Sequence, residues 1–392
     1  MLNTDISMRA VRALRAASVA LLVGGALGAC RSPQPLAAPA RILGPATGDA
    51  DSRVVIDSVN DEVVLYAGPF KIPGMAAMHD MPDMPEMKMS GMDHEAGEAK
   101  ENHAAHAFSP LVRFTWPVDG WYRGFRVSLV DSAGKDLPRA MMHHLVGIDF
   151  AHRQLLEGDL VRFIAAGVET KDVVLPRIIG VPMVAGQQLA IYAGWHNPGA
   201  TDIDGAYIRL AMPFVRKGTL VKPISVFPVQ MDVDNTPGQP DVYDLPPGKS
   251  SKAFEFQMPI AGRFLGIGGH LHDYGLELRL EDASSNDVVA RVASERDATG
   301  KVQGVGRKFY PIVGLKMAAG KKYRVVGTYD APQKDTVMNG AMAIMAGVFA
   351  PNDPSQWPKA NYSDPETHAD IESLPGGSKV TAPVIGQMVK RP

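Results

Sequence analysis

The sequence predicts an all-β fold of two jelly-roll-like antiparallel β-sandwich domains. Its apolar runs are short, rich in Val, Ile and Leu, and separated by turn residues, as strands of a sandwich are. The 392 residues include 39 Gly and 31 Pro, and no long helical apolar period appears among them. A chain of this length accommodates one large domain or two medium ones.

The N-terminus has the pattern of a lipoprotein signal peptide over residues 1–30. Three arginines precede the apolar run 16–26, which is too short to span a bilayer as a mature helix. The run ends in LGAC, which resembles a bacterial lipobox with Cys30 as the lipidated residue. Cys30 is the only cysteine, so no intrachain disulfide is possible. The alternative is an ordinary signal peptide followed by a buried cysteine.

The residue after the lipobox is Arg31, and the absence of Asp there favours sorting to the outer membrane. We therefore expect a cell-envelope protein that faces the periplasm and touches the membrane through its lipid anchor only. A net charge of −2 gives no reason to expect nucleic acid as a partner.

Residues 31–53 are rich in Pro, Ala and Gly and are predicted to be a tether. A biased tract follows at 75–106, inserted in the first domain. Prolines and acidic residues there disfavour a helix packed into a core, and thioether and imidazole are copper ligands. We predict an accessory, weak copper-binding loop that uses Met75, Met78, His79, Met81, Met84, Met87, Met89, Met92, His94, His103 and His106.

Strand-like runs recur from Phe108 onward. In the first domain, residues 54–230, they are PLVRFTWPV, YRGFRVSLVD, HHLVGIDF, QLAIYAGWHN and AYIRLAMPFV. The Pro/Asp/Gly-rich stretch DVDNTPGQPDVYDLPPGKSS is the predicted interdomain boundary. In the second domain, residues 231–353, the runs are KAFEFQMP, RFLGIGGH, LELRLED, VVARVA, KYRVVGTYD and AMAIMAGVF. Residues 354–392 are predicted to be a loose or surface-wrapping tail.

Histidines within these apolar runs are the candidate metal ligands. Alternate residues of a strand point to one face, so His270 and His272 can present two imidazoles to one ion. Met342 follows in the same domain, with Met338 as the alternative thioether. In the first domain the candidates are His143, His144 and His196. A satisfied core histidine is the alternative interpretation of His144 or His196.

At these residues the chain is similar to the copper type II, ascorbate-dependent monooxygenases, the family of peptidylglycine α-hydroxylating monooxygenase and dopamine β-monooxygenase. That family has two jelly-roll-like domains, each with one copper ion. The adjacent His143 and His144, with the later His196, resemble its first site. The His270–His272 pair with a distant methionine resembles its second. The resemblance covers roughly residues 55–352.

The resemblance implies a monooxygenase with two copper ions. Its second site, here His270, His272 and Met342, would be the catalytic one, where O2 is activated to take hydrogen from a C–H bond. The three-histidine site would deliver the other electron. The implied partners are a small-molecule substrate, O2, and an electron donor, either ascorbate or another reductant.

Three departures from the family leave other functions open. The chain has no disulfides, Gly268 stands near the place of the family's peptide-binding arginine, and the Met/His tract is an addition. The tract favours an alternative function as a non-catalytic periplasmic lipoprotein that binds or buffers copper. A hydrolytic zinc site at the three histidines is a further alternative, since zinc also accepts such ligands.

Overall fold

The computed structural model describes residues 51–74, 107–167, 170, 172–234, 242–310 and 313–376. The predicted signal peptide, Cys30, most of the tether and the whole Met/His-rich tract lie outside the described residues. Within the described part of the chain, no helix is both long enough and apolar enough to cross a membrane.

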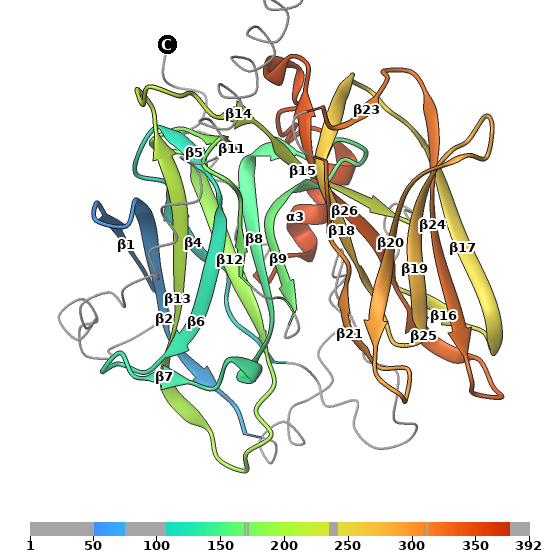
Figure 1. The fold of residues 1–392 in the computed structure, drawn as a ribbon. Helices are drawn as coiled ribbons and strands as arrows, with labels where there is room; N and C mark the ends of the chain where they lie inside the picture. Colours follow the sequence, from blue (N-terminus) through green and yellow to red (C-terminus); the bar gives the residue numbers. More distant parts are fainter. Residues whose placement is uncertain are drawn as a thin grey trace, which may run out of the picture. The chain divides into compact units, whose positions relative to one another are not determined.

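The fold is all-β, and the predicted pair of antiparallel sandwiches is confirmed (Figure 1). In the first, a nine-stranded sheet contains β1 (Asp51–Asp57), β2 (Glu62–Ile72), β5 (Gly120–Tyr122), β6 (Gly124–Val130), β7 (Asp136–Leu137), β10 (Val173–Val174), β11 (Ile179–Met183), β13 (Ile203–Arg216) and β14 (Ile224–Ser225). The facing five-stranded sheet contains β3 (Ala107–Phe108), β4 (Val112–Thr115), β8 (Met142–Arg153), β9 (Leu160–Gly167) and β12 (Gln188–Trp195).

The second sandwich pairs two sheets of five strands each. One contains β15 (Phe227–Asp232), β18 (Gly262–Leu271), β22 (Lys308–Phe309), β23 (Leu315–Met317) and β26 (Ala343–Pro351). The other contains β17 (Gly248–Gln257), β19 (Gly275–Asp282), β20 (Val288–Arg296), β21 (Val302–Val305) and β24 (Lys322–Ala331). A short ribbon, β16 (Tyr243–Leu245) with β25 (Val337–Ala341), completes it.

Strand pairing changes from the first sandwich to the second between β14 and β15. Strand β14 pairs with β11, whereas β15 pairs with β26 along its whole length. Pairing within the second sandwich therefore starts at Phe227, four residues before the predicted boundary at residue 231. The described residues 242–251 of the Pro/Asp/Gly-rich stretch include β16 and the start of β17. The sequence FPVQMD is expected at the end of the first domain. It alternates buried and half-buried residues, as a strand does, and forms β15 of the second sandwich.

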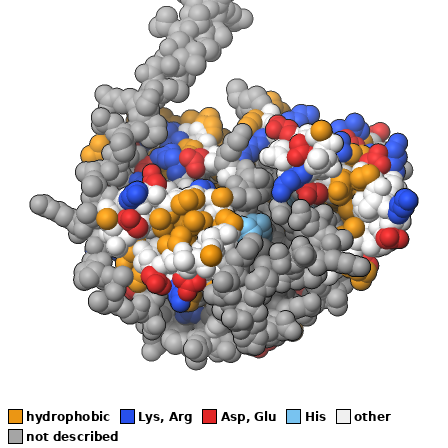
Figure 2. Space-filling view, turned by 90° about the horizontal axis from the view of Figure 1, so that it is seen from below, with side chains coloured by type: hydrophobic (Ala, Val, Ile, Leu, Met, Phe, Trp, Pro, Cys, Tyr) orange, Lys and Arg blue, Asp and Glu red, His pale blue; other side chains and the backbone are white. Residues whose placement is uncertain are grey.

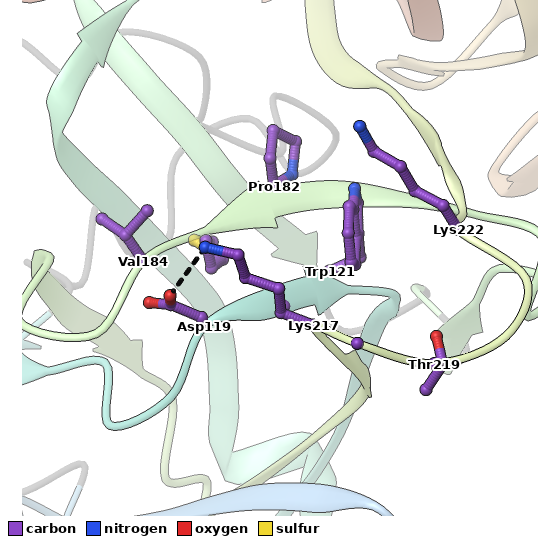
Figure 3. A pocket seen from close by; sticks show the side chains of 10 residues that line it. Asp119, Trp121, Pro182, Val184, Lys217, Thr219 and Lys222 are labelled. Carbon is purple, nitrogen blue, oxygen red and sulfur yellow. Dashed lines mark hydrogen bonds and ion pairs between the residues drawn. The ribbon is translucent and has the colours of Figure 1, made fainter.

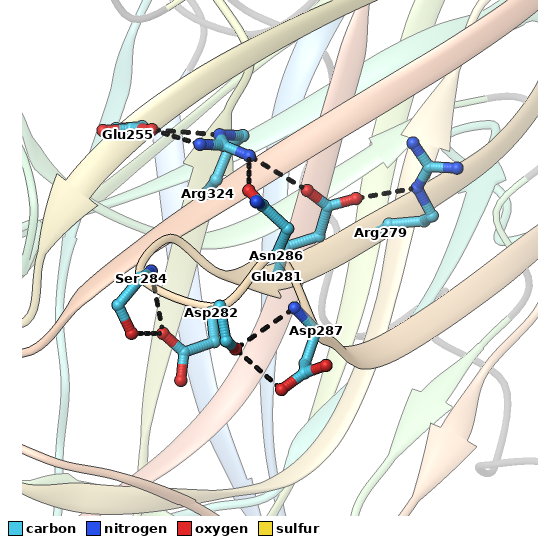
Figure 4. Close-up of polar contacts among 9 residues, drawn as sticks. Glu255, Arg279, Glu281, Asp282, Ser284, Asn286, Asp287 and Arg324 are labelled. Atoms are coloured by element: carbon cyan, nitrogen blue, oxygen red, sulfur yellow. Dashed lines mark hydrogen bonds and ion pairs between the residues drawn. The ribbon is translucent and has the colours of Figure 1, made fainter.

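The outward face of the β17–β24–β19–β20–β21 sheet is covered by ion pairs (Figure 4). Arg324 lies between Glu255, at 2.6 Å, and Glu281, at 3.4 Å, and Arg279 meets the other side of Glu281 at 3.1 Å. Leu278 and Leu280 of the same sheet are fully buried on the opposite side. This alternation places one face in water and the other in the core.

The predicted tail contains a helix, α3 (Pro365–Ser373), that packs on the first sandwich. Asp364 caps it through the backbone N–H of Glu366, and a proline follows at the first turn. Its sequence, PETHADIES, has too few apolar residues to show a helical period, which is why the sequence predicts only a tail there. Ile371 packs beside Val146 and Ile148 of β8.

Helix α3 is attached by a buried ion pair. The Arg162 guanidinium on β9 contacts both carboxylate oxygens of Asp370, one of them at 3.0 Å, and the backbone N–H of Leu160 donates to the same carboxylate at 2.9 Å. Burial lowers the pKa of Arg162, but the Asp370 carboxylate more than offsets this and raises it overall. The Arg162 guanidinium therefore stays charged at any physiological pH.

We predict that Asp370→Asn lowers the free energy of unfolding by about 3–5 kcal/mol, because it leaves a buried guanidinium without a counter-charge. Urea unfolding followed by circular dichroism measures this. Glu372→Gln on the same helix is the control: its exposed pair with His368 contributes about 0–1 kcal/mol. Equal losses in the two variants would show that the buried pair does not hold the helix.

Candidate metal centres

A β-bulge brings the adjacent histidines of β8 to the same side of the sheet. On β12, Gly194 pairs with His144, but the next residue, Trp195, pairs with Met142. One step on β12 thus spans two steps on β8, and His143 is the extra residue. Neighbouring residues of a regular strand point to opposite faces, and a bulge re-aims one of them. The two imidazole centroids lie 4.1 Å apart as a result.

His196 lies directly beside this bulge. It follows the end of β12, and its backbone N–H donates to the carbonyl of Met141 at 2.9 Å. Its ring centroid is 6.2 Å from that of His143. Gly194, two residues earlier, leaves room: a Cβ there would stand 3.3 Å from the Phe108 ring and 3.6 Å from His144. The three predicted histidines of the first sandwich are therefore gathered at one place.

The second histidine pair lies on the outward face of the β15–β26–β18 sheet. Leu271 and Gly269 alternate with the histidines and face the core, where Gly269 abuts Leu278 of the opposite sheet. His270 and His272 therefore point to the other face, and their ring centroids are 5.4 Å apart. In Figure 2 a histidine side chain is visible at the molecular surface.

The strand register places Met342 on the same face as these histidines. Leu271 pairs with Ala343 and His270 with Ile344, so continuing the register by one position puts His272 opposite Met342, which lies just before β26. The His272 N–H donates to the Met342 carbonyl at 3.2 Å. Directly opposed residues of antiparallel strands share a face. Met342 is fully buried in a small apolar cluster with Val242 and Ile344.

Met338, the alternative thioether, lies elsewhere. It belongs to β25, which pairs with β16, and 69% of it is exposed to solvent. Nothing in this pairing brings it to the face that carries His270 and His272. The register therefore favours Met342.

Tyr329 holds the end of the strand pair at Met342, and sequence reasoning missed it. Its hydroxyl donates to the Met342 carbonyl and accepts from the Met342 N–H at 3.2 Å. It reaches there from β24, in the opposite sheet of the same sandwich. Burial raises the pKa of Tyr329, so the phenol stays protonated. The contact with Met342 joins two sheets of the sandwich, and the local sequence KYRVVGTYD does not indicate which strand Tyr329 will meet.

Two charged groups lie on the outward face near the second histidine pair. Ile344 of β26 lies between two strands: it pairs with Asp232 of β15 on one side and with His270 of β18 on the other. Burial raises the pKa of Asp232 to about 7, although the Asp234 N–H bonded to its carboxylate acts in the opposite direction. Arg307 packs over Gly268, with its Cγ 3.5 Å from where a Cβ would stand.

The ring separations are compatible with shared metal ions. When two imidazoles bind one ion through metal–nitrogen bonds of about 2.0–2.1 Å, the distance between their ring centroids is at most roughly 6.5 Å. The separations of 4.1, 6.2 and 5.4 Å all fall within this limit. Imidazole with thioether also suits copper.

Within the described residues, however, no three His, Cys, Asp or Glu side chains form a group that could hold a metal ion as they stand. A three-nitrogen site on the first sandwich therefore requires side-chain rotation from the conformations seen here. The second set has only two histidines, because its third member is a thioether. The predicted accessory ligands of the Met/His tract lie outside the described residues.

Comparisons with known proteins assign no family. No family model matches the chain, and no curated protein matches it. Among solved structures, the STIV MCP is 9% identical with a TM-score of 0.31, over 62% of this chain and 91% of that one. PNGF-II is 10% identical with a TM-score of 0.28, over 72% of this chain and 65% of that one. With TM-scores this low, neither likeness identifies a function.

We predict that Tyr329→Phe lowers the free energy of unfolding by about 1–3 kcal/mol, because the buried N–H of Met342 loses its hydroxyl partner and the carbonyl keeps only the His272 N–H. Chemical denaturation measures the loss, and hydrogen exchange of the Met342 amide should accelerate. Tyr310→Phe is the control, since its buried hydroxyl has no partner within the described part of the chain. A loss no larger in Tyr329→Phe than in the control would refute the role of Tyr329.

Proposed function

We propose that the chain binds two copper ions and hydroxylates a C–H bond of a small molecule, with O2 and two external electrons. His143, His144 and His196 would hold one ion, and His270, His272 and Met342 the other. The observation that supports the proposal is the strand register at the end of β18, because its continuation by one position puts Met342 opposite His272, on the side of the sheet that carries His270. Copper, when bound, would supply one-electron redox chemistry and reactivity toward O2.

The two ligand sets differ in a way that suits two roles. Three imidazoles hold copper in either oxidation state, whereas a thioether is a softer ligand and favours the reduced ion. The sets lie on different sandwiches, so the ligands of one ion do not compete for the other.

The chain's own residues would orient the second set. Core packing of Gly269 against Leu278 fixes the direction of the neighbouring histidines, and Tyr329 fixes the backbone of Met342. His270 and His272 are both partly exposed, which leaves the outward face accessible to a small substrate. We further propose that ascorbate or another reductant supplies the electrons, and that a lipid on Cys30 holds the protein in the cell envelope.

A second candidate function is copper binding or buffering without turnover. The observation that favours it is the Met/His-rich tract at 75–106, whose composition suits weak copper capture. The two functions share the same folded sites. They differ in whether the copper-loaded protein consumes O2 in the presence of a reductant and a substrate.

We predict that the protein binds two copper ions tightly and further copper weakly, and that deletion of residues 75–106 removes only the weak fraction.

His144→Ala or His196→Ala should abolish the three-nitrogen Cu(II) signal and leave the other ion in place, because the ligand sets lie on separate sandwiches. Metal analysis with electron paramagnetic resonance measures both. His368→Ala, on the exposed side of α3, is the control. Preference for zinc, or loss of both ions in one variant, contradicts the proposal.

We predict that Met342→Ile removes the sulfur neighbour of Cu(I) while Cu(II) binding through His270 and His272 persists. X-ray absorption on the reduced protein detects the sulfur. Reductant-dependent O2 uptake with substrate should fall by a factor of about 100 or more. Met338→Ile, at an exposed position, is the control and should change neither measurement.

Each other outcome has a separate meaning. A sulfur signal lost only in Met338→Ile would assign the thioether to Met338. A wild-type protein that binds copper with a sulfur neighbour, yet shows no reductant-dependent O2 uptake across a panel of small substrates, is a copper carrier and not an oxygenase.

A further inference from the structure

Apolar side chains lie exposed at one end of the first sandwich. The chain between β13 and β14 turns at Gly218, whose φ of +92° is strained for other residues, and then presents Leu220 and Val221 to solvent. Leu220 is 102% exposed and Val221 63%. The Leu220 side chain therefore rests on no other described part of the chain.

Further exposed aliphatic residues surround this loop. Ile178 is 59% exposed and Ile224 40%, and they adjoin because the Ile224 N–H donates to the Ile178 carbonyl at 2.8 Å. Val184, also 59% exposed, lines a hollow together with Thr219 of the loop. Single exposed aliphatic residues are ordinary on a protein surface, but a group on adjoining segments indicates a binding surface.

The loop lies at the mouth of a cavity of about 430 Å³ (Figure 3). Trp121 and Pro182 form part of its wall, and the Trp121 indole N–H is held by the Ser225 hydroxyl at 3.2 Å. Lys217 and Lys222 also line it. The Lys222 ammonium stands 6.0 Å from the centre of the Trp121 ring. The hollow thus combines an aromatic wall with cations at its rim.

The charge of the loop is positive only. Residues 216–224 read RKGTLVKPI and contain three basic residues and no acidic one, in a chain whose net charge is −2. One neighbouring acid, Asp119, pairs with Lys217 at 3.3 Å. The fully exposed aliphatic tip is thus flanked on both sides by lysine.

We propose that this loop, residues 216–224, docks on an anionic phospholipid surface. Leu220 and Val221 enter the boundary between headgroups and acyl chains, and Lys217 and Lys222 contact lipid phosphates. Aliphatic residues flanked by lysines on flexible stems suit such an interface. A tip without packed neighbours fits a fluid lipid layer better than the shaped groove of a protein. This contact goes beyond the expectation that only a lipid anchor reaches the membrane.

The test uses the chain from residue 31 onward, which lacks the predicted signal peptide and Cys30, and vesicles of phosphatidylcholine with or without phosphatidylglycerol. Leu220→Ser with Val221→Ser should weaken binding to the mixed vesicles at least tenfold. Lys217→Gln with Lys222→Gln should remove the preference for phosphatidylglycerol. Val313→Ser, at an exposed valine of the second sandwich, should bind as the parent does. All these side chains are exposed, so the fold is retained.

A label reports where the membrane is touched. Because Cys30 is the only cysteine, Leu220→Cys in the chain from residue 31 onward carries one environment-sensitive fluorophore. Its emission should shift to the blue when vesicles are added, and a label at Val313→Cys should not shift. An unchanged emission at position 220 on bound vesicles, or a shift that grows with protein concentration without lipid, overturns the proposal; the latter would indicate a second copy as the occupant.

Discussion

The register between β18 and β26 is the constraint on which the second ligand set depends. A slip of one residue would exchange the faces of every side chain in the pair and turn His270 into the core of the sandwich. Packing prevents this, because Gly269 lies so close to Leu278 that no larger side chain fits there. Apolar packing on one side of the sheet thus determines where the polar ligands point on the other. Preorganisation of this kind requires no metal ion.

The first sandwich gathers its histidines by the opposite device, a local irregularity. A regular strand would send His143 and His144 to opposite faces, and only the extra residue opposite Trp195 brings the rings together. Bulges leave one residue out of the ladder, and they occur often beside functional sites. A bulge at an adjacent histidine pair is thus an independent reason to regard this place as a site.

Much of the fold could be predicted from the sequence, because strands depend on local alternation. The apolar runs of the sequence correspond to strands such as β8, β12, β18 and β26, and the shared face of His270 and His272 follows from the same period. Other features depend on pairings distant in the sequence. The bulge at His143 depends on how β12 lies beside β8, the attachment of α3 depends on Arg162, and the anchoring of Met342 depends on Tyr329. None of these has a local signature, so sequence reasoning missed them.

Stability and the proposed chemistry are largely separated in this molecule. Of the five candidate histidines, His196 is exposed and His143, His270 and His272 are half-buried, whereas His144 is buried. The large apolar side chains fill the sandwich interiors. Substitution of one of the four half-buried or exposed histidines therefore removes a ligand without opening a cavity in the core, whereas truncation of His144 also removes buried volume. Tyr329 also joins the two, because one hydroxyl serves both the core of the second sandwich and the backbone of Met342. Substitutions of Tyr329 should affect the fold and the ligand geometry together. The effect of such a substitution on copper binding must therefore be compared with its effect on the free energy of unfolding.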